Sequence, residues 1–230
     1  MNPEASKGGH STRLLLFGML LSWCAALLLF RFVRSGSFAL RFLAWNLFLA
    51  AIPAVAAWFF ARAMAKDSSR IEQVGLFVIW LVFLPNAPYI ITDFVHLKAR
   101  PGIPLWYDTA LLISCAGTGL LLGYTSIADV QAAITRRFSA FVGWVLVIAA
   151  VLLSGFGIYL GRFLRWNSWD TVASPNQLFP EIADRLINPL SHPQAVGVTA
   201  VYGVGLFLGY VALRFWQPPT LGAGDQTGPR

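Results

Sequence analysis

The chain has 230 residues, of which 57% are hydrophobic and 12% are charged, and its formal net charge is +7. Ordinary soluble domains are about 45–50% apolar and about 25% charged, so this composition excludes a typical soluble core and indicates a chain that lies mostly in lipid. The positive charge does not indicate nucleic acid as a partner, because the basic residues stand at the ends of apolar runs and not in a cluster interleaved with aromatic residues.

Six apolar runs are each long enough to cross a bilayer as a helix, which takes about 20 residues. We therefore predict an all-α polytopic membrane protein, in which residues 13–216 form one bundle of six transmembrane helices. The tails, 1–12 and 217–230, are rich in small polar residues, glycine and proline, and we predict that they are disordered. The predicted spans lie near residues 14–33, 40–61, 73–91, 106–127, 138–161 and 195–216.

Small residues recur four positions apart in several spans, which lets helix backbones approach closely in lipid. We expect these pairs to pack the bundle internally, with a homo-oligomer interface as the second possibility. The pairs are Gly119 with Gly123, Gly157 with Gly161, and Gly205 with Gly209.

The third span ends in Leu-Pro-Asn-Ala-Pro-Tyr-Ile-Ile-Thr-Asp-Phe-Val-His, residues 84–96. Its two prolines weaken the helix end, and its polar residues Asn86, Tyr89, Asp93 and His96 are spaced three, four and three apart. On an α-helix this spacing places them on one stripe, opposite an apolar face. The stripe indicates either a functional site or an interfacial helix whose polar side faces water.

Six spans place the 1–2, 3–4 and 5–6 connections on one membrane face. Three polar segments should therefore meet there, namely residues 86–96, 106–108 and 159–170. We expect Arg162 and Arg165 to contact lipid phosphates, to pair with a buried aspartate, or to bind an anionic ligand. The long 162–194 connection also holds residues 181–187, which could form a short interfacial helix. The candidate ligand-binding residues are Asn86, Tyr89, Asp93, His96, Asp108, Tyr159, Arg162, Arg165, Asn167 and Asp170.

Asp93 and His96 are also candidates for an acid and base, because histidine titrates near neutral pH and a carboxylate can fix its tautomer. A metal site would need Asp108 and His192 to complete it, and this set favours structural pairing over metal binding. We therefore predict no metal site and no cofactor.

The orientation of the spans is not decided by charge, because the side with both tails carries nine of the 17 lysines and arginines and the other side carries eight. We expect both termini to be cytoplasmic, in the inner membrane of a bacterial cell.

Three motifs together resemble those of an uncharacterised family of bacterial multi-pass membrane proteins, domain of unknown function 1361. They are residues 84–93, Trp-Tyr-Asp at 106–108, and Gly-Ile-Tyr-Leu-Gly-Arg-Phe-Leu-Arg-Trp-Asn-Ser-Trp-Asp at 157–170. The resemblance covers roughly residues 40–215. It implies a membrane protein but no activity, cofactor or catalytic residue.

Three hypotheses of function follow. The protein binds a polar or anionic ligand, or assists its transport, at the polar face. Alternatively it is a membrane-embedded enzyme that acts on a lipid-linked or headgroup substrate, or a structural partner in the membrane. Membrane lipids and an unknown small molecule are the expected partners. A ligand site requires the polar residues to converge on one cavity, and transport requires a polar path across the bundle.

Overall fold

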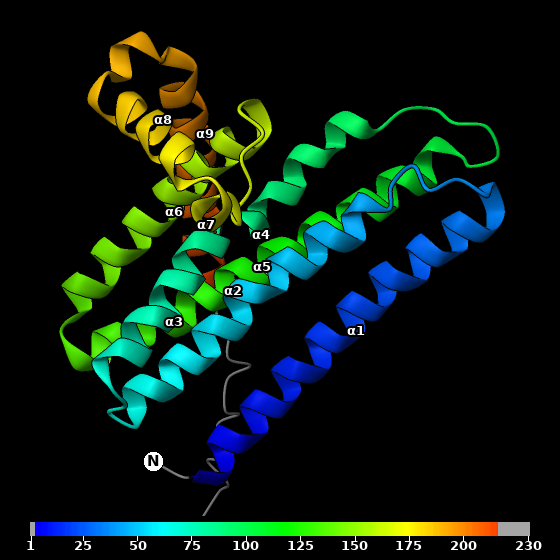
Figure 1. Ribbon diagram of the computed structural model, residues 1–230. Coiled ribbons are helices and arrows are strands. Elements are labelled where there is room, and N and C mark those ends of the chain that lie inside the picture. The colour runs from blue at the N-terminus through cyan, green and yellow to red at the C-terminus, as the bar shows by residue number, and fades with distance from the viewer. Residues whose placement is uncertain (1–2, 216–230) are drawn as a thin grey trace, which may run out of the picture.

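A computed structural model of the protein describes residues 3–215, and these form α-helices and short 3-10 helices without any β-strand. Figure 1 shows the arrangement of the helices. The elements are α1 (Pro3–Ser35), α2 (Phe42–Ala65), α3 (Arg70–Phe83), α4 (Asn86–Tyr89), η1 (Ile90–His96), α5 (Leu105–Arg137), α6 (Ala140–Phe163), α7 (Asp170–Ala173), α8 (Pro175–Ile187), η2 (Pro189–Ser191) and α9 (Pro193–Phe215).

Six segments are long and apolar enough to cross a membrane, which confirms the predicted all-α, multi-pass architecture. The third span combines α3, α4 and η1 and is therefore longer than predicted. The fourth also extends beyond residue 127 to Arg137, because Val130 and Ala133 continue its buried face. The segments are Thr12–Ser35, Phe42–Ala65, Arg70–His96, Leu105–Arg137, Ala140–Phe163 and Pro193–Phe215.

Helix α1 begins at Pro3, within the N-terminal tail whose disorder stays a prediction. Proline is favourable in the first turn of a helix, where its missing N–H needs no partner, and Ala5 and Lys7 are good helix formers. The expected disordered tail at 217–230 lies outside the described residues.

The core of the bundle is formed by α2, α3, α5, α6 and α9, with α5 in contact with both α2 and α6. Trp80 is fully buried there, and its indole Nε1 donates to Ser126 Oγ at 3.1 Å. In Figure 1 the turns that follow α1 and η1 lie at the same end of the molecule as α7 and α8, and the α2–α3 and α5–α6 turns lie at the other. This arrangement places the three polar segments at one end, as expected.

Helix α1 buries little of its surface and packs mainly against α5 (Figure 1). Polar contacts hold it there along its length, where lipid offers no competing hydrogen bonds. Arg13 pairs with Asp129 at 2.8 Å near one end, and Trp23 Nε1 donates to Ser114 Oγ at 3.2 Å further along. Tyr107 donates its hydroxyl hydrogen to the carbonyl of Leu27 at 2.8 Å.

The small residues pack the bundle internally, as predicted, at five of the six positions. A Cβ on Gly119 or Gly123 would press on Ala87, and one on Gly157 would press on Pro85. Gly161 and Gly209 lie against the rings of tyrosines 89 and 124. Gly205 is the exception, because no other helix of the described chain has a heavy atom within 4 Å of its Cβ position.

Replacing Gly155 with leucine should destabilise the protein, because the new Cβ would lie 2.7 Å from the carbonyl oxygen of Thr199 on α9. Overpacking of this kind costs about 1–3 kcal/mol. We expect Gly155→Leu to lower the melting temperature in detergent. Gly205→Leu should leave it unchanged, since the new Cβ meets no other helix among the described residues. Equal melting temperatures for the two variants would show that the α6–α9 contact is not close.

Candidate functional site

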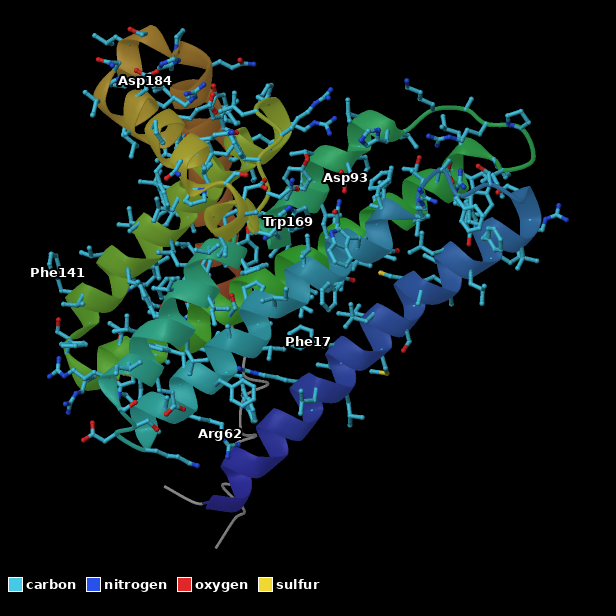
Figure 2. All side chains as sticks on the ribbon, viewed as in Figure 1. Phe17, Arg62, Asp93, Phe141, Trp169 and Asp184 are labelled. Carbon is cyan, nitrogen blue, oxygen red and sulfur yellow. The ribbon has the colours of Figure 1, made fainter. Side chains whose placement is uncertain are left out.

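A cavity of about 600 Å³ lies between α2, the α3–η1 segment, α6 and residues 166–186. Its wall contains six of the ten candidate residues, from segments far apart in the chain. In Figure 2, Asp93 and Trp169 lie toward the end of the molecule that carries α8, with Arg62 at the opposite end. The candidate residues in the wall are Asn86, Tyr89, Asp93, His96, Arg162 and Asn167.

The break in the third span places four of these residues on the cavity. The helix of α3 ends at Phe83, before the two prolines, and the chain continues as the short α4 and then as η1, a 3-10 helix. A 3-10 helix has three residues per turn, so Asp93 and His96 lie one above the other. The stripe expected on an α-helix is therefore preserved, although its second half has a tighter geometry.

Asp93 is almost fully buried at 2% exposure, and its carboxylate is held by a neighbouring span. Asn46 Nδ2 on α2 donates to Asp93 Oδ2 at 2.8 Å, and both residues line the cavity. Asn46 was not among the candidate residues, although it stands alone as a polar residue within the apolar second span. That isolation in an apolar run was itself a signal, because polar groups within a span usually have a partner.

Arg162 stands at the end of α6 and lines the same cavity. Its charge acts on Asp93 and His96, but no residue of the described part of the chain forms an ion pair or hydrogen bond with its guanidinium. The ring of His96 packs edge-on against Phe42 on α2, with the ring centroids 4.9 Å apart. The cavity thus combines a cation without a direct partner, a buried carboxylate and a half-buried imidazole.

The connection after α6 is fixed over the cavity by hydrogen bonds to the end of α3. Asn86 Nδ2 donates to the carbonyl of Phe83 at 2.9 Å and to Ser168 Oγ at 2.8 Å. The Ser168 hydroxyl in turn donates to the carbonyl of Val82 at 3.0 Å. Trp169, next along the connection, packs edge-on against Trp45 of α2, and both tryptophans line the cavity.

Asp108 does not reach the cavity, contrary to the expectation that it joins the site, because two arginines bind it elsewhere. Arg31 Nε donates to Asp108 Oδ1 at 2.7 Å, and the side chains of both residues are 2% exposed. Arg100 pairs with the other oxygen at 3.2 Å and also donates to the carbonyl of His96 at 3.0 Å. The carboxylate therefore joins α1, the loop before α5 and α5 itself, which is a structural role.

Three further candidates also lie outside the cavity wall. Tyr159 is buried within α6, where it stacks on Phe156 and Phe163, and it is not among the residues that line the cavity. Arg165 is exposed in a left-handed conformation (φ +63°) just after α6. Asp170 begins α7 and accepts a hydrogen bond from the backbone N–H of Asn167 at 2.7 Å, so it fixes the connection.

Helix α8 covers one side of the cavity with an apolar face. From the sequence, we expected a helix only over residues 181–187 of this segment. Trp166 Nε1 donates to Glu181 Oε2 at 2.7 Å, which links the helix to the connection after α6. At its other end, Asp184 accepts from Asn188 Nδ2 at 2.9 Å and contacts His192 Nε2 at 2.8 Å. These two hydrogen bonds lower the pKa of Asp184 from its ordinary value.

No three histidine, cysteine, aspartate or glutamate side chains within residues 12–215 gather closely enough to hold a metal ion. His192, one candidate for such a site, contacts Asp184 on α8 and is not among the residues that line the cavity.

The family model described as Protein of unknown function (DUF1361) matches residues 45–211, more than two thirds of the chain. The chain belongs to this family. The matched region contains the polar residues of the cavity but leaves out α1. No curated protein and no protein of solved structure was found to match the chain.

Replacing Asp108 with asparagine should destabilise the protein, because Arg31 then keeps a buried charge without a counter-charge. Breaking a buried ion pair in this way costs about 3–5 kcal/mol. The control is Asp67→Asn, since Asp67 is 81% exposed and 3.9 Å from Arg137. In thermal unfolding in detergent, the melting temperature should fall strongly for Asp108→Asn and hardly at all for Asp67→Asn. A small loss at Asp108 would contradict its structural role.

Proposed function

We propose that this membrane protein binds an anionic ligand in the cavity between α2, the third span and α6. The observation that carries the proposal is the guanidinium of Arg162, which lines the cavity and has no ion pair within residues 12–215. The side chain of Arg162 is only partly buried, and an anion that enters the cavity gains charge-assisted hydrogen bonds from its guanidinium. Arginine also presents a planar fork of donors that matches a carboxylate or phosphate.

The ligand should also carry a hydrogen-bond donor beside its anionic group. Asp93 is bound by Asn46 through one oxygen and faces the same cavity as Arg162. An ionised carboxylate only accepts hydrogen bonds, so it favours a ligand hydroxyl or amine and repels a bare anion. A hydroxyl-bearing phosphate or carboxylate satisfies both groups together.

Binding on one face is better supported than transport across the bundle. A second cavity lies deeper, between α5, α6 and α9, but its volume is only about 10 Å³. Its wall is apolar apart from Tyr124 and Ser154, so it does not extend the polar surface of the first cavity. We therefore place the activity at the end of the bundle that carries the polar segments.

Acid–base catalysis is the second candidate function, because Asp93 and His96 border the same cavity as Arg162. In that case Arg162 would hold the anion while the carboxylate and imidazole exchange protons with the substrate.

Replacing Arg162 with glutamine should weaken binding of sn-glycerol 3-phosphate, a phosphate with free hydroxyls. Hydrogen bonds to charged groups contribute about 1.5–3 kcal/mol, so we expect a loss of about tenfold to a hundredfold in affinity by calorimetry in detergent. Arg162→Lys should retain part of the affinity, since lysine keeps the charge but not the fork.

The control for this experiment is Arg165→Gln. Arg165 lies three residues after Arg162, is exposed and does not line the cavity, so this variant removes the same charge without changing the site. It should bind the phosphate as the unmodified protein does. An equal loss of affinity in the two variants would show that net charge alone causes the effect, and would refute the assignment of Arg162 to the site.

Binding and catalysis are separated by the fate of an acylated glycerol phosphate incubated with the protein. A binder returns the lipid intact from both the unmodified protein and the Asp93→Asn variant, as measured by mass spectrometry. An enzyme that uses Asp93 converts the lipid, and the variant loses about 10²–10⁴-fold in rate. Conversion at equal rates by both proteins would exclude Asp93 as acid or base.

A further inference from the structure

The polar groups occupy only one end of the cavity, and most of the remaining wall is apolar. Leu49 on α2, Leu81 on α3 and Leu153 on α6 line it at positions inside the spans. Leu153 and Arg162 stand nine residues apart on α6, which is about 13.5 Å along a helix axis. The cavity is therefore elongated, with a cation at the end near the connections and a hydrocarbon surface deeper in the bundle.

The cavity is also too large for an anionic group alone. One water molecule occupies about 30 Å³ of liquid, so 600 Å³ holds about twenty groups of that size. A phosphate or carboxylate fills a small part of this space. A hydrocarbon chain matches the rest of the wall better than water does, because apolar side chains offer water no hydrogen bonds.

Helix α8 supplies a further apolar surface, which the protein covers at Leu178 and leaves exposed toward Leu186. Leu178, Ile182 and Leu186 follow each other at intervals of four and all line the cavity, so they form one helix face. Leu186 lines the cavity while remaining 64% exposed, and Phe179 does so at 55% exposure. Side chains of this kind are available to contact a hydrocarbon chain.

We propose that the ligand is a lipid anion, whose charged head pairs with Arg162 and whose chain lies between α8 and the apolar walls of α2, α3 and α6. This inference rests on the proposed anion site and specifies the chemical class of its ligand. The membrane is the source of the occupant, because the apolar end of the cavity is formed by residues of the spans. The free hydroxyls of a glycerol- or sugar-phosphate lipid match the acceptor on Asp93.

The test compares three probes with the purified full-length protein in one detergent. They are sn-glycerol 3-phosphate, its singly acylated form lysophosphatidic acid, and a monoacylglycerol with the same chain. We expect lysophosphatidic acid to bind at least about tenfold more tightly than either of the others, since the chain buries several methylene groups. Affinities are measured by native mass spectrometry or calorimetry.

The outcomes separate the lipid inference from the anion site. If glycerol phosphate binds as tightly as its acylated form, the lipid inference is overturned and the anion site stands. If the monoacylglycerol binds as tightly as lysophosphatidic acid, or if no probe binds, the anion site itself fails.

A matched pair of variants on α8 tests where the chain lies. Leu186 lines the cavity and Ile187 does not, yet the two are neighbours with 64% and 76% exposure. Leu186→Asn should weaken lysophosphatidic acid binding by about fivefold and leave glycerol phosphate binding unchanged. Ile187→Asn should affect neither ligand. Equal effects of the two variants on lipid binding would overturn the position of the chain along α8.

Discussion

The close approach of the broken third span to α5 and α6 is the contact on which the site depends. Pro85 lies against Gly157, and Ala87 lies against Gly119, at distances that leave no space for a Cβ on either glycine. Because the backbones touch there, the chain beyond Phe83 stays against the bundle after its α-helix ends. The polar residues that follow the prolines therefore line the cavity between the spans.

The charged residues at this end of the molecule fall into two groups, those paired with one another and those that border the cavity. Asp108 is buried and paired with two arginines, so nothing remains of it for a ligand. Arg162 lies on the cavity without an ion pair within the described residues, and the nearby Asp93 is held by an uncharged asparagine. Of the cations predicted at this face, only one is both half-buried and on the cavity wall, and it defines the ligand that we propose.

Much of the fold could be predicted from the sequence because spans obey simple limits of length and hydropathy. The same limits gave the topology, which placed residues 86–96 and 162–170 at one end of the bundle. The ends of helices were less predictable, since residues 128–137 continue α5 through tertiary contacts and not through hydropathy. The apolar face of α8 was missed beyond residues 181–187, because two prolines conceal its helical pattern.

The sequence by itself determined the class of the protein, the number of spans and the common end of the polar segments, because hydrophobic length and chain connectivity do not depend on packing. Only the tertiary structure decided which polar residues share a cavity. Spacing along a helix gives the direction of a side chain but not its partner. Asp108 and Arg162 were both candidate ligand-binding residues in the sequence. The structure separates them, because Arg31 of α1 pairs with Asp108 and no described residue forms an ion pair with Arg162.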